Sequence, residues 1–137
     1  MAAIRSSDTK PELLIRKSLH ARGYRYRLHD RQLPGRPDIV LPKYNAAIFV
    51  HGCFWHGHDC HLFKWPKTRS EFWRKKISDN TLRDRIAMTE LEARDWRIGI
   101  VWECALRGTR RIQPDQLIQN IDDWLRSEKP RLQIASI

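Results

Sequence analysis

The stretch DIVLPKYNAAIFVH, residues 38–51, contains two short apolar runs that are separated by turn residues. The expected strands, 38–41 and 46–50, are apolar on both faces. Such strands are typical of a central sheet that is covered by helices on both sides. The stretch therefore predicts a hairpin in the middle of a helix-covered sheet.

The length of the turn decides which side chains of this hairpin lie opposite one another. If Tyr44 and Asn45 form a two-residue loop, residue 41 pairs with residue 48, and Asp38 lies opposite His51. A carboxylate and an imidazole at the mouth of a sheet can hold Mg²⁺. The alternative is an aspartate that only initiates a turn after a proline, and the spacing alone leaves both open.

Helices and a further strand are expected around the hairpin. Residues 9–23 predict a helix with Thr9 as N-cap and Gly23 beyond its end. Further expected elements are helical segments at 70–77, capped by Ser70, and at 81–95, a strand at 96–103 and an amphipathic helix at 114–128. The strand–helix–strand order implies that the strands at 46–51 and 96–103 are parallel. We expect one α/β domain over residues 1–137, with a tail at 126–137.

The charge of the chain indicates a polyanionic partner. Its 137 residues include 26 Lys and Arg against 16 Asp and Glu, a formal net charge of +10. Such a balance favours nucleic acid, because each neutralised phosphate releases condensed counterions. No apolar run is long enough to span a bilayer, and the opening residues MAAIRSSDTK lack the apolar region of a signal peptide. We therefore expect a cytoplasmic protein that binds nucleic acid and has no membrane partner.

The three cysteines indicate metal binding rather than disulfides. An odd number of cysteines in a chain without a secretory signal favours thiolate ligands in a reducing compartment. Cys53 and Cys104 follow the two strands that are expected to be parallel, so both thiols would lie at one edge of the sheet. With Cys60 and one histidine they make a set suited to structural Zn²⁺, and the alternative is that they are small buried residues. The histidine is His58 or His61.

Three sequence motifs resemble one nuclease family. Pro37-Asp38, followed one strand later by a second motif, resembles the PD-(D/E)xK nuclease core, although the second position reads Phe49-Val50-His51. The fuller set LPGRPDIV (33–40), FVHGCFWHGHDCHLFKWPKTRSEFW (49–73) and VWECALRG (101–108) resembles the very short patch repair, or Vsr-type, DNA mismatch endonucleases. In that family an aromatic-x-His element replaces (D/E)xK. The resemblance covers residues 1 to about 125 and implies a restriction-endonuclease-like mixed sheet flanked by helices, with a structural zinc site.

The resemblance also implies a role for most of the unusual side chains. It selects His58 as the fourth zinc ligand and makes His56 the acid/base near the nucleophilic water, because an imidazole exchanges protons near neutral pH. His51 would lie beside the magnesium site, which Asp38 anchors and the backbone of Val50 completes; that position is commonly Thr in the family. The acids matching Glu12 and Asp84 hold waters around magnesium. Their structural alternatives are a capping box and a solvated helix face.

A group of aromatic and basic residues is expected to contact DNA. Aromatic side chains among basic ones suit stacking on bases or wedging between them, and the alternative is core packing. The family resemblance favours a wedge that enters the duplex beside a mismatch. The residues expected in this interface are Phe54, Trp55, Trp73, Lys76 and, from the N-terminal segment 1–8, Met1 and Ile4.

The sequence therefore predicts a monomeric Mg²⁺-dependent endonuclease that acts on double-stranded DNA with a T·G mismatch. By resemblance it nicks on the 5′ side of the T, at the lesion left by deamination of 5-methylcytosine. A G·T wobble stacks less well than a matched pair, so opening it costs less. Two alternatives are a non-catalytic zinc-stabilised DNA-binding module and a hydrolase that uses Zn²⁺ at the histidine cluster directly.

Overall fold

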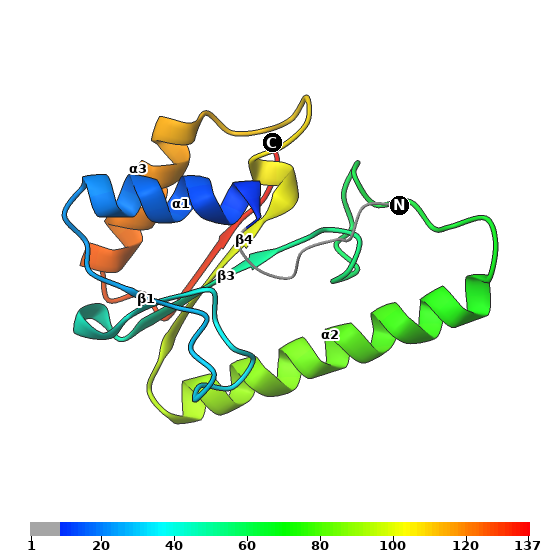
Figure 1. Ribbon diagram of the computed structural model, residues 1–137, viewed down its shortest axis with the longest axis horizontal. Coiled ribbons are helices and arrows are strands. Elements are labelled where there is room, and N and C mark those ends of the chain that lie inside the picture. Colours follow the sequence, from blue (N-terminus) through cyan, green and yellow to red (C-terminus); the bar gives the residue numbers. More distant parts are fainter. Residues whose placement is uncertain (1–8) are drawn as a thin grey trace.

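The computed structural model describes residues 9–137, and in these residues five strands form one mixed sheet in the order β1-β2-β3-β4-β5 (Figure 1). The strands are β1 (Arg27–Leu28), β2 (Ile39–Leu41), β3 (Ala46–His51), β4 (Arg97–Trp102) and β5 (Arg131–Ile134). The pairs β1–β2 and β2–β3 are antiparallel, and the pairs β3–β4 and β4–β5 are parallel. The α/β class and the parallel β3–β4 pair are as the sequence predicted.

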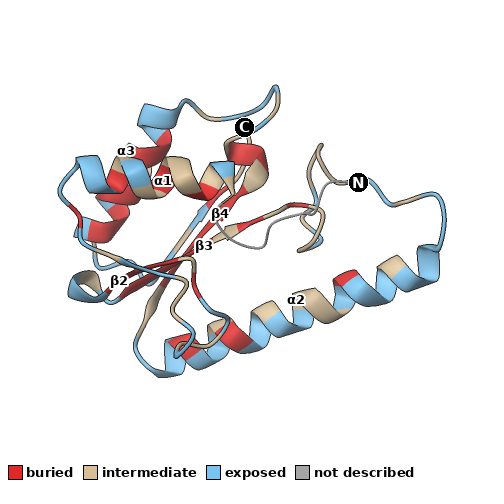
Figure 2. Cartoon of the chain, in the orientation of Figure 1, coloured by how far each residue is buried: buried red, intermediate tan, exposed pale blue. Residues whose placement is uncertain are grey.

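Helices cover both faces of this sheet. Helices α1 (Lys10–Ala21) and α3 (Pro114–Arg126) lie on one face, and the long helix α2 (Ser70–Ala93) crosses the other (Figure 1). Successive strand residues point to opposite faces, so Ile48 packs with the α1 and α3 side chains while Phe49 packs with Leu91 of α2. The sheet is buried at its centre, and most of the outward surface of α2 is exposed (Figure 2). No helix within residues 9–137 is long and apolar enough to cross a membrane.

Local sequence signals set the ends of α1 correctly. The Thr9 hydroxyl accepts a hydrogen bond from the Glu12 backbone N–H at 3.4 Å, and Gly23 has φ +87° just beyond the helix. The expected cap of α2 was wrong. Arg69 is the N-cap residue, with φ +53°, and Ser70 is the first helical residue.

The two helical segments expected between 70 and 95 are one continuous helix. The polar residues 78–80 do not interrupt it, because they make contacts that helical geometry allows. Asp79 pairs with Lys75 one turn earlier, with 2.9 Å between the charged atoms, and the Asn80 side chain donates to the carbonyl of Trp55 at 3.0 Å.

The expected hairpin register was wrong by two residues. Leu41 pairs with Ala46 and Ile39 with Ile48, because Pro42–Tyr44 form a single 3₁₀ turn and Asn45 takes a left-handed conformation with φ +50°. Pro42 cannot donate a ladder hydrogen bond, so it ends β2 earlier than a two-residue loop requires. Asp38 is therefore not paired with His51.

Two edge strands were not expected from the sequence. β1 has two residues, and β5 lies inside the segment expected to be a tail. β5 follows α3 and pairs with β4, which extends the parallel part of the sheet. Because β3 and β4 are parallel, the loops that follow them lie at the same end of the sheet.

Candidate active site

Three clusters of titratable side chains lie near the ends of β2, β3 and β4. In each cluster the possible ligand atoms lie within 4.8 Å of one another. The clusters are the acid cluster (Glu12, His29 and Asp38), the histidine cluster (His51, His56 and Asp84) and the thiol cluster (Cys53, His58, Cys60 and Cys104). Every member except His29 was a candidate from the sequence.

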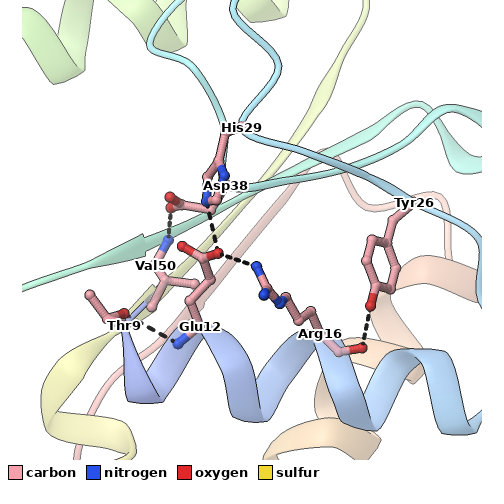
Figure 3. Close-up of polar contacts among 7 residues, drawn as sticks. All are labelled: Thr9, Glu12, Arg16, Tyr26, His29, Asp38 and Val50. Atoms are coloured by element: carbon pink, nitrogen blue, oxygen red, sulfur yellow. Dashed lines mark hydrogen bonds and ion pairs between the residues drawn. The ribbon is translucent and has the colours of Figure 1, made fainter. Parts of the chain in front are cut away.

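The acid cluster joins α1 to the hairpin (Figure 3). Asp38 precedes β2, and its Oδ2 accepts a hydrogen bond from the Val50 backbone N–H at 2.7 Å. Glu12 projects from the first turn of α1 and is only 1% exposed. Its Oε2 lies 2.8 Å from His29 Nε2 and 3.1 Å from Arg16 Nη1. Thr9 thus caps α1 through the Glu12 backbone N–H, while the Glu12 carboxylate belongs to the acid cluster.

Burial gives Asp38 an unusual affinity for protons. The pKa of Asp38 is raised to about 7, chiefly by burial and also by the nearby Glu12 carboxylate, against the lowering effects of the Val50 N–H and of His29. Two buried carboxyl groups that share one site can both ionise only if positive charge is supplied. A divalent cation supplies that charge, and carboxylate and carbonyl oxygens are the ligands that Mg²⁺ prefers. These residues therefore fit the expected cation.

The histidine cluster includes His51, which follows Val50 and is the last residue of β3. The rings of His51 and His56 stack at 3.8 Å between centroids with 5° between their planes. His56 Nδ1 lies 2.5 Å from Asp84 Oδ2 on α2. This contact orients the imidazole and leaves its Nε2 side for proton transfer. Asp84, weighed as a solvated residue on a helix face, is instead a partner of His56.

His51 is a neutral residue in this cluster. Its pKa is lowered to about 3, chiefly by burial and also by the neighbouring His56, while Asp84 opposes this. The ring packs against Trp102 and Phe49, so it faces the α2 layer, whereas the preceding Val50 packs with the α1 layer. Consecutive residues of β3 therefore connect the acid cluster on one side with the histidine cluster on the other.

Members of both clusters line one cleft of about 650 Å³. Glu12, Val50, His51 and His56 line it. Glu103 and Arg107, which form an ion pair with 2.7 Å between Arg107 Nη1 and Glu103 Oε2, line its other side. Neither residue was expected in the site, and their one signal in the sequence was their place in the VWECALRG motif. The cleft places carboxylates, imidazoles and a cation around one space large enough for part of a DNA backbone.

The thiol cluster lies where the loops after β3 and β4 meet. Cys53 and Cys104 are buried, and the Cys53 sulfur accepts a hydrogen bond from the Cys104 N–H at 3.4 Å. Ser136 donates its N–H to the Cys104 sulfur at 3.2 Å. Burial raises the pKa of Cys53, so its thiolate form needs a nearby positive charge. His58 Nδ1 is 3.7 Å from the Cys104 sulfur.

The donor set of the thiol cluster fits a closed tetrahedral metal site. Three sulfurs and one imidazole nitrogen are the ligands of structural zinc, and all three cysteines are free rather than disulfide-bonded. His61, the competing fourth ligand, does not belong to the cluster. Its two ring nitrogens are buried and have no hydrogen-bond partner in the described part of the chain.

The aromatic residues expected to contact DNA gather beside the cleft. The ring centroids of Phe54, Trp55 and Trp73 lie 5.2–5.8 Å apart in edge-to-face arrangements. Lys76 is exposed one turn beyond Trp73 on α2. Phe63 extends this aromatic group and contacts Phe54 at 5.9 Å. Met1 and Ile4 lie outside the described residues.

Comparison with known proteins gives consistent matches. The sequence profile of the family described as DNA mismatch endonuclease Vsr matches residues 1–62. The DNA mismatch endonuclease Vsr of Escherichia coli (strain K12) is 45% identical over 134 residues, which are 98% of this chain and 86% of that protein. The type II nicking enzyme V.XorIIP of Xanthomonas oryzae pv. oryzae (strain KACC10331 / KXO85) is 48% identical over 106 residues, 77% of this chain and 78% of that protein. The type II nicking enzyme V.NmeAIP of Neisseria meningitidis serogroup A / serotype 4A (strain DSM 15465 / Z2491) is 44% identical over 125 residues, 90% of this chain and 89% of that protein.

The mixed sheet, the cleft and these matches together define a nuclease, an enzyme that hydrolyses phosphodiester bonds in DNA. More narrowly, the chain belongs to the Vsr family of DNA mismatch endonucleases, which confirms the resemblance found in its motifs. Membership of this family favours an enzyme over the alternative of a non-catalytic DNA-binding module.

Proposed function

We propose that the chain is a Mg²⁺-dependent endonuclease that nicks one DNA strand on the 5′ side of a T mispaired with G. In this role it would initiate the repair of deaminated 5-methylcytosine. The observation that carries the proposal is the cleft that Glu12 of the acid cluster shares with His51 and His56 of the histidine cluster, where His56 is bonded to Asp84. The names of the relatives as mismatch endonuclease and nicking enzymes support it.

The acid cluster is the proposed site for magnesium. Asp38 would bind it through its carboxylate and Val50 through its backbone carbonyl, so a valine in place of the common threonine leaves that ligand intact. Glu12 and Asp84 would hold water molecules around the ion. When bound, the ion polarises a phosphate oxygen and neutralises developing charge.

His56 is the proposed acid/base. Asp84 holds its Nδ1 side at 2.5 Å, which would leave Nε2 to take a proton from the attacking water. His51, neutral at physiological pH because of its lowered pKa, would support the His56 ring by stacking without adding charge.

The thiol cluster is the proposed structural zinc site, with Cys53, His58, Cys60 and Cys104 as ligands. Zinc there would fix the loop that carries Phe54 and Trp55. With Trp73 and Lys76, and with Met1 and Ile4 from the N-terminal segment, these residues would form the wedge that opens the mispair. A rigid loop matters because inserting these side chains between bases requires free energy to unstack them.

The remaining proposals concern the chain as a whole. We propose a monomeric nuclease domain over residues 1–137 with the restriction-endonuclease-like fold, which acts in the cytoplasm. The mixed sheet covered by α1, α2 and α3 and the net charge of +10 support these assignments.

A strand-cleavage assay tests the proposed function. Duplexes with a T·G pair, and otherwise identical duplexes with a T·A pair, are incubated with the protein in Mg²⁺ and in Mg²⁺-free buffer. We expect one nick 5′ of the T, only with T·G and Mg²⁺, and none with Asp38→Ala. Binding without nicking by the wild type contradicts the proposal, and equal nicking by Asp38→Ala removes this residue from the mechanism.

A further inference from the structure

His29 is the member of the acid cluster that no sequence motif indicated. It lies between β1 and β2, and its backbone N–H donates to the Asp38 carbonyl at 3.0 Å. Its φ of +48° is in the left-handed region, where residues other than glycine are uncommon. Such strained conformations persist where the surrounding structure imposes them, often at functional sites.

The side chain of His29 reaches the other acid of the cluster. Its Nε2 lies 2.8 Å from Glu12 Oε2, and the His29 side chain is 24% exposed whereas the Glu12 side chain is 2% exposed (Figure 3). An ionised carboxylate at this depth requires hydrogen-bond donors. His29 Nε2–H is one donor to Glu12, and Arg16 is another.

His29 thus contacts both acidic residues, one through its backbone and the other through its side chain. Glu12 belongs to α1 and Asp38 to the start of β2, so no single element fixes the separation of their carboxylates. These like charges repel, and the bond to His29 holds Glu12 against that repulsion. Removal of this bond leaves the Glu12 side chain more rotational freedom.

We propose that His29 is a positioning residue, which holds the Glu12 carboxylate toward Asp38 so that the pair is ready to bind a divalent cation. This inference rests on the proposed magnesium site. It concerns a hydrogen bond that orients an acid; His29 is not assigned to the metal or to the substrate. Partners that orient metal-binding groups typically change metal affinity by about 10- to 100-fold when they are lost.

Two substitutions separate the side chain from the backbone conformation. Asparagine tolerates left-handed φ, so His29→Asn keeps the turn but is too short to reach Glu12. The amide nitrogen of His29→Gln extends about as far as histidine Nε2 and can restore the bond. His20→Asn, at an exposed histidine on α1, is the matched control.

Binding of Mn²⁺ to the DNA-free protein, followed by the loss of the free-Mn²⁺ EPR signal, measures the effect without catalysis. We expect His29→Asn to weaken Mn²⁺ binding and to raise the Mg²⁺ concentration for half-maximal nicking, each about tenfold. His29→Gln should recover most of both losses, and His20→Asn should match the wild type. The KM for DNA should stay unchanged in all variants.

The outcomes distinguish this inference from the proposed function. If the wild type neither binds Mn²⁺ nor nicks DNA, both fail. If the wild type does both and His29→Asn does so equally well, the inference alone is overturned. It is also overturned if His29→Gln recovers nothing and Co²⁺ binding suffers more than Mg²⁺-dependent nicking, because that pattern identifies a nitrogen ligand.

Discussion

Asp38 lowers the stability of the metal-free protein when its carboxyl group is ionised, and the same carboxylate is the proposed metal ligand. Its ordinary pKa of 3.8 is raised to about 7, chiefly by burial. Between these values the folded protein binds more protons than the unfolded chain, so its stability falls as the pH rises from about 4 to 7. Above pH 7 the buried charge remains a cost until a cation offsets it.

Replacement of Asp38 by asparagine should therefore stabilise the metal-free protein while it abolishes nicking. The asparagine carbonyl can still accept the Val50 N–H bond but carries no charge. At about 1.4 kcal/mol per pKa unit, we expect a gain of up to about 4 kcal/mol at pH 8 and almost none at pH 4. Urea unfolding at both pH values, in Mg²⁺-free buffer, measures it. An equal effect at both values would contradict the burial of charge as its cause.

Arg97 connects two elements that the sequence did not relate. From β4 its guanidinium donates to the carbonyls of Leu125, at 3.3 Å, and Ser127, at 2.8 Å, at the C-terminal end of α3. It also lies over the ring of Trp124, at 4.7 Å from the centroid. A cation at this end of a helix is favoured by the helix dipole. The planar guanidinium makes several of these bonds at once.

Lysine at position 97 should keep the charge but lose most of this geometry. We expect Arg97→Lys to lower the free energy of unfolding by about 2–3 kcal/mol, because several charge-assisted bonds are lost. Arg83→Lys, at an exposed position on α2, should change it by less than about 0.5 kcal/mol. Chemical denaturation of the two variants measures the difference. Equal effects would contradict the inference that the bonds of Arg97 stabilise the contact between β4 and α3.

Gly35 lets the turn before β2 approach both α2 and β3. It has φ +75°, and a Cβ atom there would lie 2.8 Å from the Ala87 Cβ and 3.1 Å from the Phe49 ring. Gly23 also has a left-handed conformation, with φ +87°, but a Cβ atom there meets nothing within 4 Å. The two glycines therefore separate backbone strain from steric overlap.

Alanine at these positions should give unequal losses. Gly23→Ala should cost about 1 kcal/mol from backbone strain alone. Gly35→Ala should cost about 2–4 kcal/mol, because overpacking adds to the strain. Thermal unfolding measures both losses of stability. The nicking rate of Gly35→Ala should also fall below that of Gly23→Ala, because the turn at Gly35 leads directly to Asp38. Equal losses of stability would show that neighbouring side chains yield at Gly35.

Among the helices and strands, the sequence predicted those whose signals lie in neighbouring residues. The cap at Thr9, the apolar strands and the amphipathic α3 could be read from neighbouring residues. The register could not, because it depends on the 3₁₀ turn at Pro42. β5 was missed because its partly polar residues are held by pairing with β4, and His29 was missed because its partner Glu12 is distant in the sequence.

The whole molecule is joined at the thiol cluster, where the loops after β3 and β4 and the residues after β5 meet. The pattern of three cysteines and a histidine predicted a metal site, and the structure brings those four ligand atoms together. The choice of His58 over His61 needed the family resemblance, since both follow Cys53 closely. The fold agrees with that choice, because His58 and not His61 belongs to the thiol cluster.

Removal of zinc should lower the stability of the folded nuclease and not only the rate of its reaction. We expect the purified protein to contain one Zn²⁺ and its chelation to lower the thermal midpoint by about 4 °C for each kcal/mol lost. Cys60→Ser should abolish the bound zinc, and His61→Ala should retain it. Metal analysis and calorimetry measure these effects. Full thermal stability of the zinc-free protein would contradict a structural role.

Val50 and His51 are neighbours on β3, yet they face opposite layers of the protein. The proposed reaction centre therefore draws on both helix layers, because Glu12 comes from α1 and Asp84, the partner of His56, comes from α2. A partly folded chain with only one helix layer in place would hold only half of the proposed centre. DNA cleavage by the proposed centre would therefore require that both helix layers have docked on the sheet.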